Sequence, residues 1–300
     1  MTASLLSRAN AVVLAVAVAA TAMPLAAQDG GQSPLLRRYR EGDSLHYVME
    51  ASNQDRTSLL RYSARADGVV RRDSLGRLVE ELDWSHLVRN GQEIPLGAGT
   101  AAVRQRLTLS PSFMLPPDLA RADRRLAPPM LDFFTFYVDL WLAVKSQLAH
   151  PGDHARIPRN SANSWADGRV VILGEDAIDF DLTLVSIDSA AGRARLMVRH
   201  VPPAVAVVRF PASWMQAPLF DTPNNWVQVT KTSDTSYQAG VGRETFDDEI
   251  DVSLADGRIL AATMDNPVDL IERACRDAAL ADCAPPDRSR IVRRITIRER

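Results

Sequence analysis

Two histidines and two acids that are able to do chemistry lie close together near the middle of the sequence. His150 and His154 stand four positions apart, with Asp153 between them and Asp167 downstream. Imidazole and carboxylate groups bind zinc, and two histidines at this spacing share one face of a helix. Pro151 and the glycine after it interrupt such a helix, so the pattern favours a turn between a helix and a strand.

We therefore expect no metal or other cofactor in this segment. Metal ligation is the alternative, completed by Asp153 or by one of the more distant histidines. These histidines are His46, His86 and His200.

The same segment contains the residue types of a serine hydrolase. Ser164, His154 and Asp167 would supply a nucleophile, a base and an orienting carboxylate. A nucleophilic serine needs a sharp turn such as Gly-x-Ser-x-Gly, and this sequence has Ala162 and Ala166 at the glycine positions. The sequence therefore argues against an enzyme. A secreted hydrolase or metal-dependent enzyme that uses the segment of His150 and His154 is the alternative function.

Two short acidic runs offer carboxylate pairs for glycosidase chemistry or calcium binding. The first contains Asp179 and Asp181, and the second covers residues 247–251. Neither run follows the spaced acid pattern of a calcium-binding loop. Because alternate residues of a strand face the same side, we expect both runs to line solvated strand faces and to pair with the many arginines.

The first 27 residues have the pattern of a secretory signal peptide. Arg8 supplies a positive charge, residues 11–23 are apolar, and small residues precede Gln28. This apolar run is too short to span a bilayer comfortably, since a span needs about 20 residues. We expect an exported protein, periplasmic or extracellular, in which residues 28–300 form one β-rich domain without a transmembrane span. A retained, uncleaved anchor is the alternative interpretation of the first 27 residues.

The charge of the chain is nearly balanced, with 35 basic and 37 acidic residues. Nucleic-acid-binding proteins normally concentrate basic charge on one face, so no such partner is expected. Basic residues cluster only in residues 287–300, where arginines alternate with isoleucine and valine. This alternation predicts a last strand with one charged face, and peripheral contact with the cell envelope is an alternative use of that face.

The two cysteines, Cys275 and Cys283, are eight positions apart. In an exported protein such a pair is expected to form a disulfide. A continuous helix would hold the two Cα atoms about 12 Å apart, whereas a disulfide needs less than about 7 Å. The chain must therefore turn between them.

Alternating apolar residues predict strands over most of the chain. Asp-Gly and Asn-Gly pairs predict hairpin turns at residues 67–68, 90–91 and 256–257. One long helical pattern, Met130–Leu148, interrupts the strands, with apolar residues at i, i+3, i+4 and i+7. Its narrow polar strip consists of Asp132, Thr135, Asp139 and Ala143.

A helix with so narrow a polar strip must be buried over most of its girth. We expect a sheet to enclose it and its aromatic side chains to line a ligand cavity. The predicted cavity residues are Phe134, Tyr137 and Trp141.

A second, shorter helix is predicted at residues 265–275. Asp265 or Asn266 would cap it, and Pro267 suits a first turn. Strands in the majority, segregated from two helices, indicate an α+β fold. The predicted architecture is a curved, half-barrel-like antiparallel sheet around the buried helix, plus this short helix in the C-terminal region.

A proline-rich loop carries more apolar surface than loops usually do. Trp214, Phe220 and Trp226 are its largest side chains. The loop is predicted to fold over the core as a lid, and a protein-interaction module that uses the Trp214–Trp226 loop is the alternative.

Three stretches carry a resemblance to exported bacterial β-rich proteins. They are residues 39–50, the buried helix followed by Gly152-Asp153 with Trp165 downstream, and residues 246–259. The arrangement is similar in architecture to the lipoprotein-carrier half-barrels of the cell envelope, in which a curved sheet wraps helices around an apolar cavity. The proline-rich residues 111–129 and the cysteine pair depart from that pattern. The resemblance implies a non-catalytic protein that binds or carries a lipid or another apolar small molecule, or a scaffold in the envelope.

Overall fold

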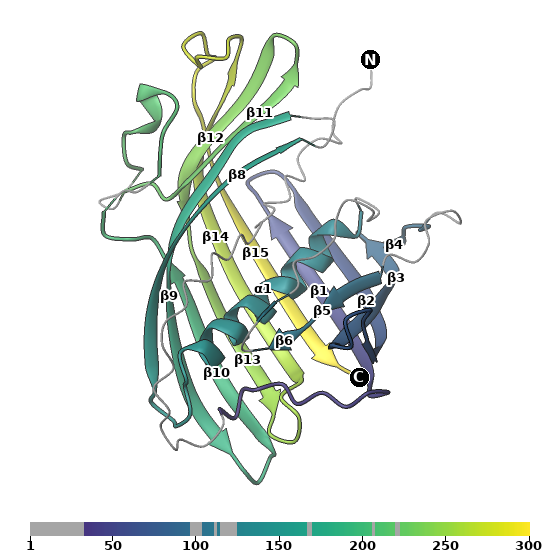
Figure 1. The fold of residues 1–300 in the computed structure, drawn as a ribbon. Helices are drawn as coiled ribbons and strands as arrows, with labels where there is room; N and C mark the ends of the chain where they lie inside the picture. The colour runs from purple at the N-terminus through teal and green to yellow at the C-terminus, as the bar shows by residue number, and fades with distance from the viewer. Residues whose placement is uncertain are drawn as a thin grey trace.

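The described part of the chain forms one large antiparallel sheet with a single α-helix against it (Figure 1). The structure is a computed structural model, and it describes residues 33–96, 104–110, 113–114, 125–166, 170–205, 208–219 and 223–300. The predicted signal peptide lies outside these ranges, as do Asp167 and Phe220. Because the described strands pair antiparallel and α1 packs against them, the predicted antiparallel sheet with a buried helix is confirmed.

The elements follow each other along the chain in three groups. The first group is β1 (Ser44–Gln54), β2 (Leu59–Arg72), β3 (Leu78–Arg89), β4 (Gln92–Glu93), β5 (Arg104–Leu107), β6 (Leu109–Ser110) and β7 (Phe113–Met114). The second is α1 (Ala127–Lys145), β8 (His154–Ala166), β9 (Val170–Asp188), β10 (Arg193–Val201) and the 3₁₀ helix η1 (Ser213–Met215). The third is β11 (Trp226–Ser233), β12 (Ser236–Glu244), β13 (Phe246–Ser253), β14 (Ile259–Cys275) and β15 (Asp287–Glu299).

All neighbouring strands of the large sheet are antiparallel, and several neighbours are far apart in the chain. From one edge, β8 pairs with β9, and β9 pairs with β10 along one half of its length and with β11 along the other. In the same way, β13 and β12 follow each other along β14. The sheet continues through β15, β1, β2 and β3, and β4 and β5 complete the other edge. The first and last long strands of the chain thus lie side by side within the sheet.

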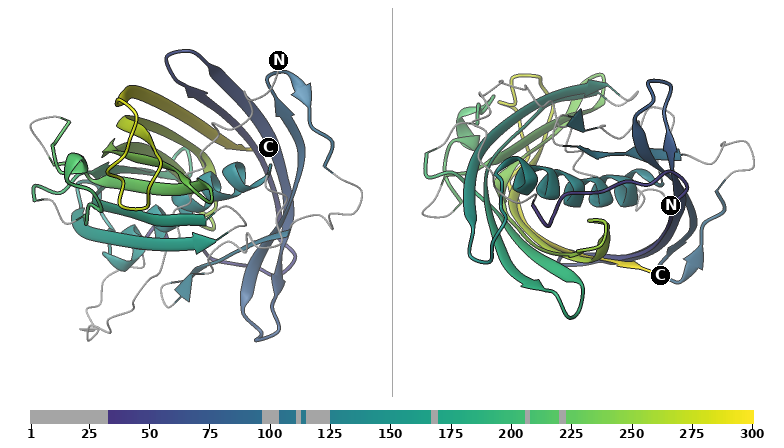
Figure 2. Two further views of the ribbon diagram at one scale, coloured as in Figure 1. Left: turned by 90° about the horizontal axis from the view of Figure 1, so that it is seen from above. Right: turned by 60° about the horizontal axis from the view of Figure 1, so that its bottom comes forward.

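Helix α1 carries the chain across the sheet. Among the strands of the large sheet, β5 comes before α1 in the chain and β8 comes after it. These two strands lie on opposite edges of the sheet. The ten strand positions from β8 to β5 would be about 43 Å wide in a flat sheet. The 19 residues of α1 extend only about 28 Å. The sheet curves around the helix (Figure 2), and this curvature brings the two edges within reach of one crossing element.

Alternating side chains decide which face of each strand meets α1. In β10, Ala194, Leu196, Val198 and His200 are buried, and the residues between them point away from the core. The helix supplies the other half of the core. Every residue from Met130 to Leu140 is buried, at 8% exposure or less.

Aromatic side chains pack where α1 crosses the first strands of the sheet. The ring centroid of Phe133 lies 4.9 Å from that of Tyr47, 5.9 Å from that of Trp84 and 5.2 Å from that of Tyr137. Tilted and edge-on ring pairs at such distances stabilise a core beyond the area that they bury. The helix predicted at Met130–Leu148 is observed at Ala127–Lys145, so both of its ends lie three residues earlier than predicted. It begins earlier because Pro128 and Pro129 fit its first turn.

The helix predicted at residues 265–275 is wrong, because these residues belong to β14. Alternate residues of that strand are buried, among them Met264, Asn266, Val268 and Leu270. Pro267 lies where the neighbour of β14 changes from β13 to β12, so its missing N–H interrupts the sheet least there. Tertiary pairing therefore overrides the local capping pattern.

Two of the three predicted turns are confirmed, and the third is wrong. Asn90 and Gly91 join β3 to β4, and Gly257 joins β13 to β14, with φ values of 49°, 79° and 73°. Gly68, in contrast, lies inside β2, where an added Cβ would come within 2.2 Å of the Glu81 carbonyl oxygen. The glycine permits close strand approach instead of a turn.

A second, smaller core lies over the far halves of β9, β11, β12 and β14. It contains Met215 from η1 and the pair Cys275 and Cys283, which form the predicted disulfide with an S–S distance of 1.99 Å. The two cysteines also form an isolated β-bridge, so the chain turns back between them as the geometry required. Within the described ranges, no helix combines the length and hydropathy needed to cross a bilayer.

Candidate functional site

The polar strip of α1 faces the sheet instead of solvent. Asp132 and Asp139 are seven residues apart and lie on the same side of the helix. Asp132 is 5% exposed and Asp139 is 0% exposed. A buried carboxylate needs a hydrogen-bonded or charged partner, and each of these two acids meets a different group of side chains on the sheet.

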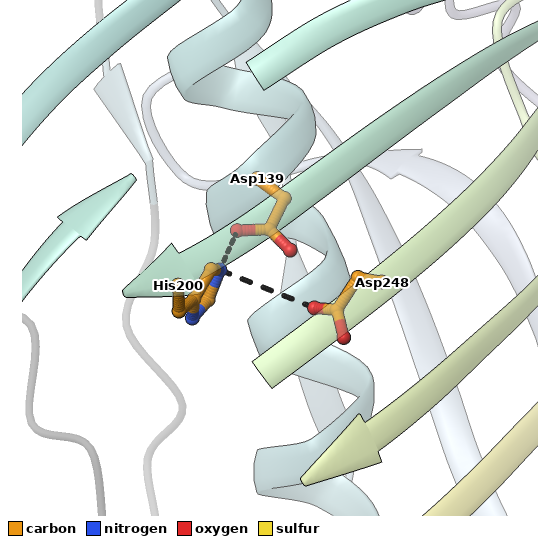
Figure 3. A group of neighbouring side chains, drawn as sticks. All are labelled: Asp139, His200 and Asp248. Atoms are coloured by element: carbon orange, nitrogen blue, oxygen red, sulfur yellow. Dashed lines mark hydrogen bonds and ion pairs between the residues drawn. The ribbon is translucent and has the colours of Figure 1, made fainter. Parts of the chain in front are cut away.

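Asp139 meets His200 of β10 and Asp248 of β13 (Figure 3). A hydrogen bond of 2.8 Å joins His200 Nε2 to Asp139 Oδ1. The Oδ2 atom of Asp248 lies 4.0 Å from the same nitrogen. Their side chains are at most 1% exposed, so the group lies in the buried interior between helix and sheet.

Strand register places His200 and Asp248 next to each other. His200 pairs with Phe246 at the end of β10, and Asp248 follows two positions later on the same face of β13. The aromatic rings of Phe180 and Phe246 lie 4.3 Å and 4.9 Å from the imidazole, measured between centroids. The ring nitrogen and the two carboxyl groups therefore face one another in apolar surroundings.

Burial raises the pKa of Asp248 well above its usual range. The negative charge of Asp139 acts in the same direction, whereas His200 lowers it. Once protonated, Asp248 can donate a hydrogen bond to Asp139, which favours the neutral form further. The two carboxyl groups and the imidazole can therefore share protons or bind another cation.

These three residues are the one group of His, Cys, Asp and Glu side chains in the described part of the chain whose ligand atoms could hold a metal ion together. All three ligand atoms lie within 4.8 Å of one another. His200 was expected only as a distant partner of the loop histidines. Asp139 was assigned to the polar strip and Asp248 to a solvated strand face, so the sequence contained all three residues without indicating that they meet.

The break between strand pairs lies directly beyond this group. Here β10 ends and β11 begins, and β12 ends and β13 begins. Side-chain amides replace some of the backbone hydrogen bonds that are missing at this break. Asn225 Nδ2 donates to the carbonyl oxygens of Ala177 and Glu244, at 3.1 Å and 3.0 Å. Asn266 Nδ2 donates to the Thr245 carbonyl oxygen at 2.8 Å. Satisfied buried amides of this kind fix one arrangement of the strands.

Asp132, at the other polar position of α1, contacts Tyr62 of β2 and Arg293 of β15. Arg293 also donates to Asn266 Oδ1 at 3.1 Å. The side chains of Arg293 and Asp132 are 19% and 7% exposed. The ion pair therefore connects the helix to the middle of the sheet within a largely desolvated space.

A third polar contact involves Glu80 of β3. Arg37 Nε donates to Glu80 Oε1 at 2.9 Å, and the hydroxyl group of Tyr137 donates to the other carboxylate oxygen. Burial raises the pKa of Tyr137 well above its usual range, and the charge of Glu80 adds to this rise. Tyr137 therefore remains a neutral donor that connects α1 to β3.

The two predicted loop histidines contact separate acids. His150 Nδ1 lies 3.6 Å from Asp153 Oδ2, and His154 Nε2 contacts Asp181 of β9. The side chains of His150 and His154 are 82% and 52% exposed. Asp153 accepts backbone hydrogen bonds from residues 149 and 150, which lowers its pKa and closes the turn. Ser164 lies in β8, and its side chain is not among those described.

The acidic runs divide between the two faces of the sheet. Asp179 is paired with Arg156 at 2.8 Å, and Asp247 is paired with Arg199 at 3.1 Å. Asp251 accepts two hydrogen bonds from Arg195, at 2.7 Å and 2.8 Å. The expected pairing with arginines is therefore confirmed for these three acids. Asp181 contacts His154 instead, and Asp248 faces the helix.

The aromatic residues of the predicted cavity lie along α1. Phe134 and Tyr137 are buried, and Trp141 is partly exposed with the Lys145 ammonium 5.5 Å from its ring centroid. In the predicted lid, Trp214 packs against the second core and donates from Nε1 to the Leu280 carbonyl oxygen at 3.2 Å. Trp226 begins β11 and is also partly buried.

Comparison with known protein families and with curated proteins finds no match to this sequence.

Proposed function

We propose that this chain is an exported envelope protein that binds an apolar ligand, such as a lipid, between helix α1 and the concave face of the sheet. The observation that carries the proposal is the burial of α1. A helix that is apolar on nearly every side crosses the hollow of one curved open sheet, and its residues 130–140 are all buried. This arrangement is compatible with the half-barrel of a lipoprotein carrier.

The apolar surface between α1 and the sheet is suited to acyl chains. Its apolar side chains contact apolar side chains of the sheet, and acyl chains would present the same kind of surface. Replacing one apolar partner by another changes little of the hydrophobic free energy, because that term depends on the area removed from water. The polar contacts of Asp132, Tyr137 and Asp139 are few and lie on the sheet side of the helix, so they hold it in one position.

The remaining features agree with an exported location. A disulfide such as the one between Cys275 and Cys283 is typical of proteins in the oxidising compartments outside the cytosol. The arginines of β15 that point outward include Arg294, which pairs with Asp265 at 2.8 Å, and Arg290, which lies 3.9 Å from Asp269. A peripheral contact with the envelope through this charged face is part of the proposal.

Tryptophan quenching tests the site of binding. Trp84 lies beneath α1, where it is 3% exposed and donates to Gln105 Oε1 at 2.7 Å. A brominated fatty acid that binds between helix and sheet is expected to quench the fluorescence of Trp84 and Trp141. The same fatty acid without bromine is the control for conformational effects on fluorescence.

Three variants assign the quenching to one site. Trp84→Phe and Trp141→Phe should each remove part of a saturable quenching, whereas Trp214→Phe should leave it unchanged. Quenching that disappears only in Trp214→Phe would place binding on the Trp214–Trp226 loop instead. The absence of saturable quenching in the unmodified protein would refute the proposed function.

A further inference from the structure

The group formed by Asp139, His200 and Asp248 has the donor set of a metal site. We propose that these three side chains bind one divalent metal ion, for which zinc is the best match, and that the ion joins α1 to β10 and β13. This inference does not depend on the apolar-ligand function proposed above.

The distances in the group fit a small ion after slight movement. Zinc lies about 2.0–2.2 Å from nitrogen and carboxylate oxygen, so two donors of a tetrahedral site are about 3.3 Å apart. The Nε2 atom of His200 is 2.8 Å from Asp139 Oδ1 and 4.0 Å from Asp248 Oδ2. These two distances bracket the required value, and side-chain rotations that move atoms by less than about 1 Å would equalise them.

Asp248 supplies a second and independent reason to expect a cation. Both of its oxygen atoms are buried, and among the described residues neither has a hydrogen-bond partner. An ionised carboxylate in such a position is costly unless a positive charge compensates it. A divalent ion would neutralise Asp139 and Asp248 together. A proton held between the two carboxyl groups is the competing arrangement, and the experiment below separates the two.

The chemistry of the donors selects the class of metal. Calcium prefers six to eight oxygen ligands, whereas this group offers one imidazole nitrogen and two carboxyl groups. Zinc accepts nitrogen and oxygen donors in a four-coordinate site, so three protein ligands leave one position for water or a second carboxylate oxygen. Phe180 and Phe246 lie close to the imidazole ring. The buried position indicates a structural ion that holds α1 in place, not a site open to substrate.

Metal loading during refolding tests the proposal. The protein is purified with its disulfide intact, unfolded in guanidinium with a chelator, and refolded with or without zinc chloride. We expect one zinc ion per chain by elemental analysis and a higher thermal unfolding midpoint in the zinc-loaded protein. His200→Gln and Asp248→Asn should each lower zinc affinity by more than about 100-fold, since loss of outer-shell partners alone costs 10–100-fold.

His154→Gln is the matched control. It removes a histidine that also contacts an aspartate, Asp181, but at a site where the imidazole is 52% exposed. This variant should retain one zinc ion with unchanged affinity. Zinc that persists in both His200→Gln and Asp248→Asn, or an unmodified protein that binds no stoichiometric zinc, would overturn the proposal.

A measurement on the unmodified protein covers the case in which a variant does not fold. Zinc binding should shift the ¹⁵N resonance of His200 Nε2 and leave the other four imidazoles of the chain unchanged. A zinc-dependent shift confined to other histidines would contradict the assignment of the site.

Discussion

The ion pair between Asp132 of α1 and Arg293 of β15 offers the most direct test of how the helix is held. The side chains are 7% and 19% exposed, so removing one charge leaves the other largely desolvated. Loss of one partner from a buried pair typically costs 3–5 kcal/mol. Asp132→Asn keeps the shape of the side chain and a possible acceptor for Tyr62, so we expect a loss near the lower end, about 3 kcal/mol.

Urea unfolding measures this loss. With an m value of about 3 kcal/mol/M, a loss of about 3 kcal/mol moves the unfolding midpoint down by about 1 M. The m value itself should stay constant, because the same surface becomes exposed. Added salt should change the loss little, since buried pairs are weakly screened.

The next residue along β15 provides a matched control. Arg294 points to the opposite face, where it pairs with Asp265 at 2.8 Å, and the two side chains are 71% and 61% exposed. Asp265→Asn should therefore cost less than about 1 kcal/mol, and this effect should fade with salt.

A double variant completes the test. Replacing both partners, as Asp132→Asn with Arg293→Met, removes the uncompensated charge and should recover part of the stability lost in Asp132→Asn. Equal losses in Asp132→Asn and Asp265→Asn would refute the conclusion that the buried contact holds α1 to the sheet.

Three further predictions concern other parts of the chain. Replacing Cys275 and Cys283 by serine should lower the free energy of unfolding by about 2–3 kcal/mol, the loop-closure value for eight residues, and a loss below 1 kcal/mol in urea unfolding would contradict it. Gly68→Ala should destabilise by more than about 2 kcal/mol, because its Cβ would come within 2.2 Å of the Glu81 carbonyl oxygen, and a soluble variant of unchanged midpoint would disprove the close contact. Hydrogen bonds from the backbone N–H of Thr57 and from the side chain of Ser58 lower the pKa of Asp55 to about 2. The turn that contains Asp55 should therefore be stabilised above pH 3.8 and should lose that stabilisation as the pH falls through 2. A carboxyl NMR titration of Asp55 with a midpoint at 3.8 would contradict this.

Several features were predictable because they depend on local patterns. The period of apolar residues identified the buried helix, and its ends differ by three residues at each side from those predicted. Alternation identified the strands of the second half of the chain. The spacing of Cys275 and Cys283 predicted the disulfide and excluded a continuous helix between them. In each case the physical cause acts within a few residues.

The errors arose where pairing between distant segments decides the outcome. Pro267 and its neighbours satisfy the rules of a helix start, but residues 265–275 complete a ladder with β12, β13 and β15. Gly68 resembles a turn residue, but strand β3 approaches it closely. Local propensities are worth tenths of a kcal/mol to about 1 kcal/mol per residue, and cooperative sheet pairing exceeds them.

The candidate metal site shows the same division. The sequence by itself determined that α1 carries two acids on one narrow strip and that Asp248 lies in an acidic run on a strand, and it offered His200 only as a distant ligand for the loop histidines. Only the tertiary structure decided that the strip faces the sheet and that the three side chains meet within 4.8 Å. The reason is physical: Asp139 and Asp248 are separated by 109 residues of chain, and their proximity follows from strand register and sheet curvature. No local periodicity encodes either of these.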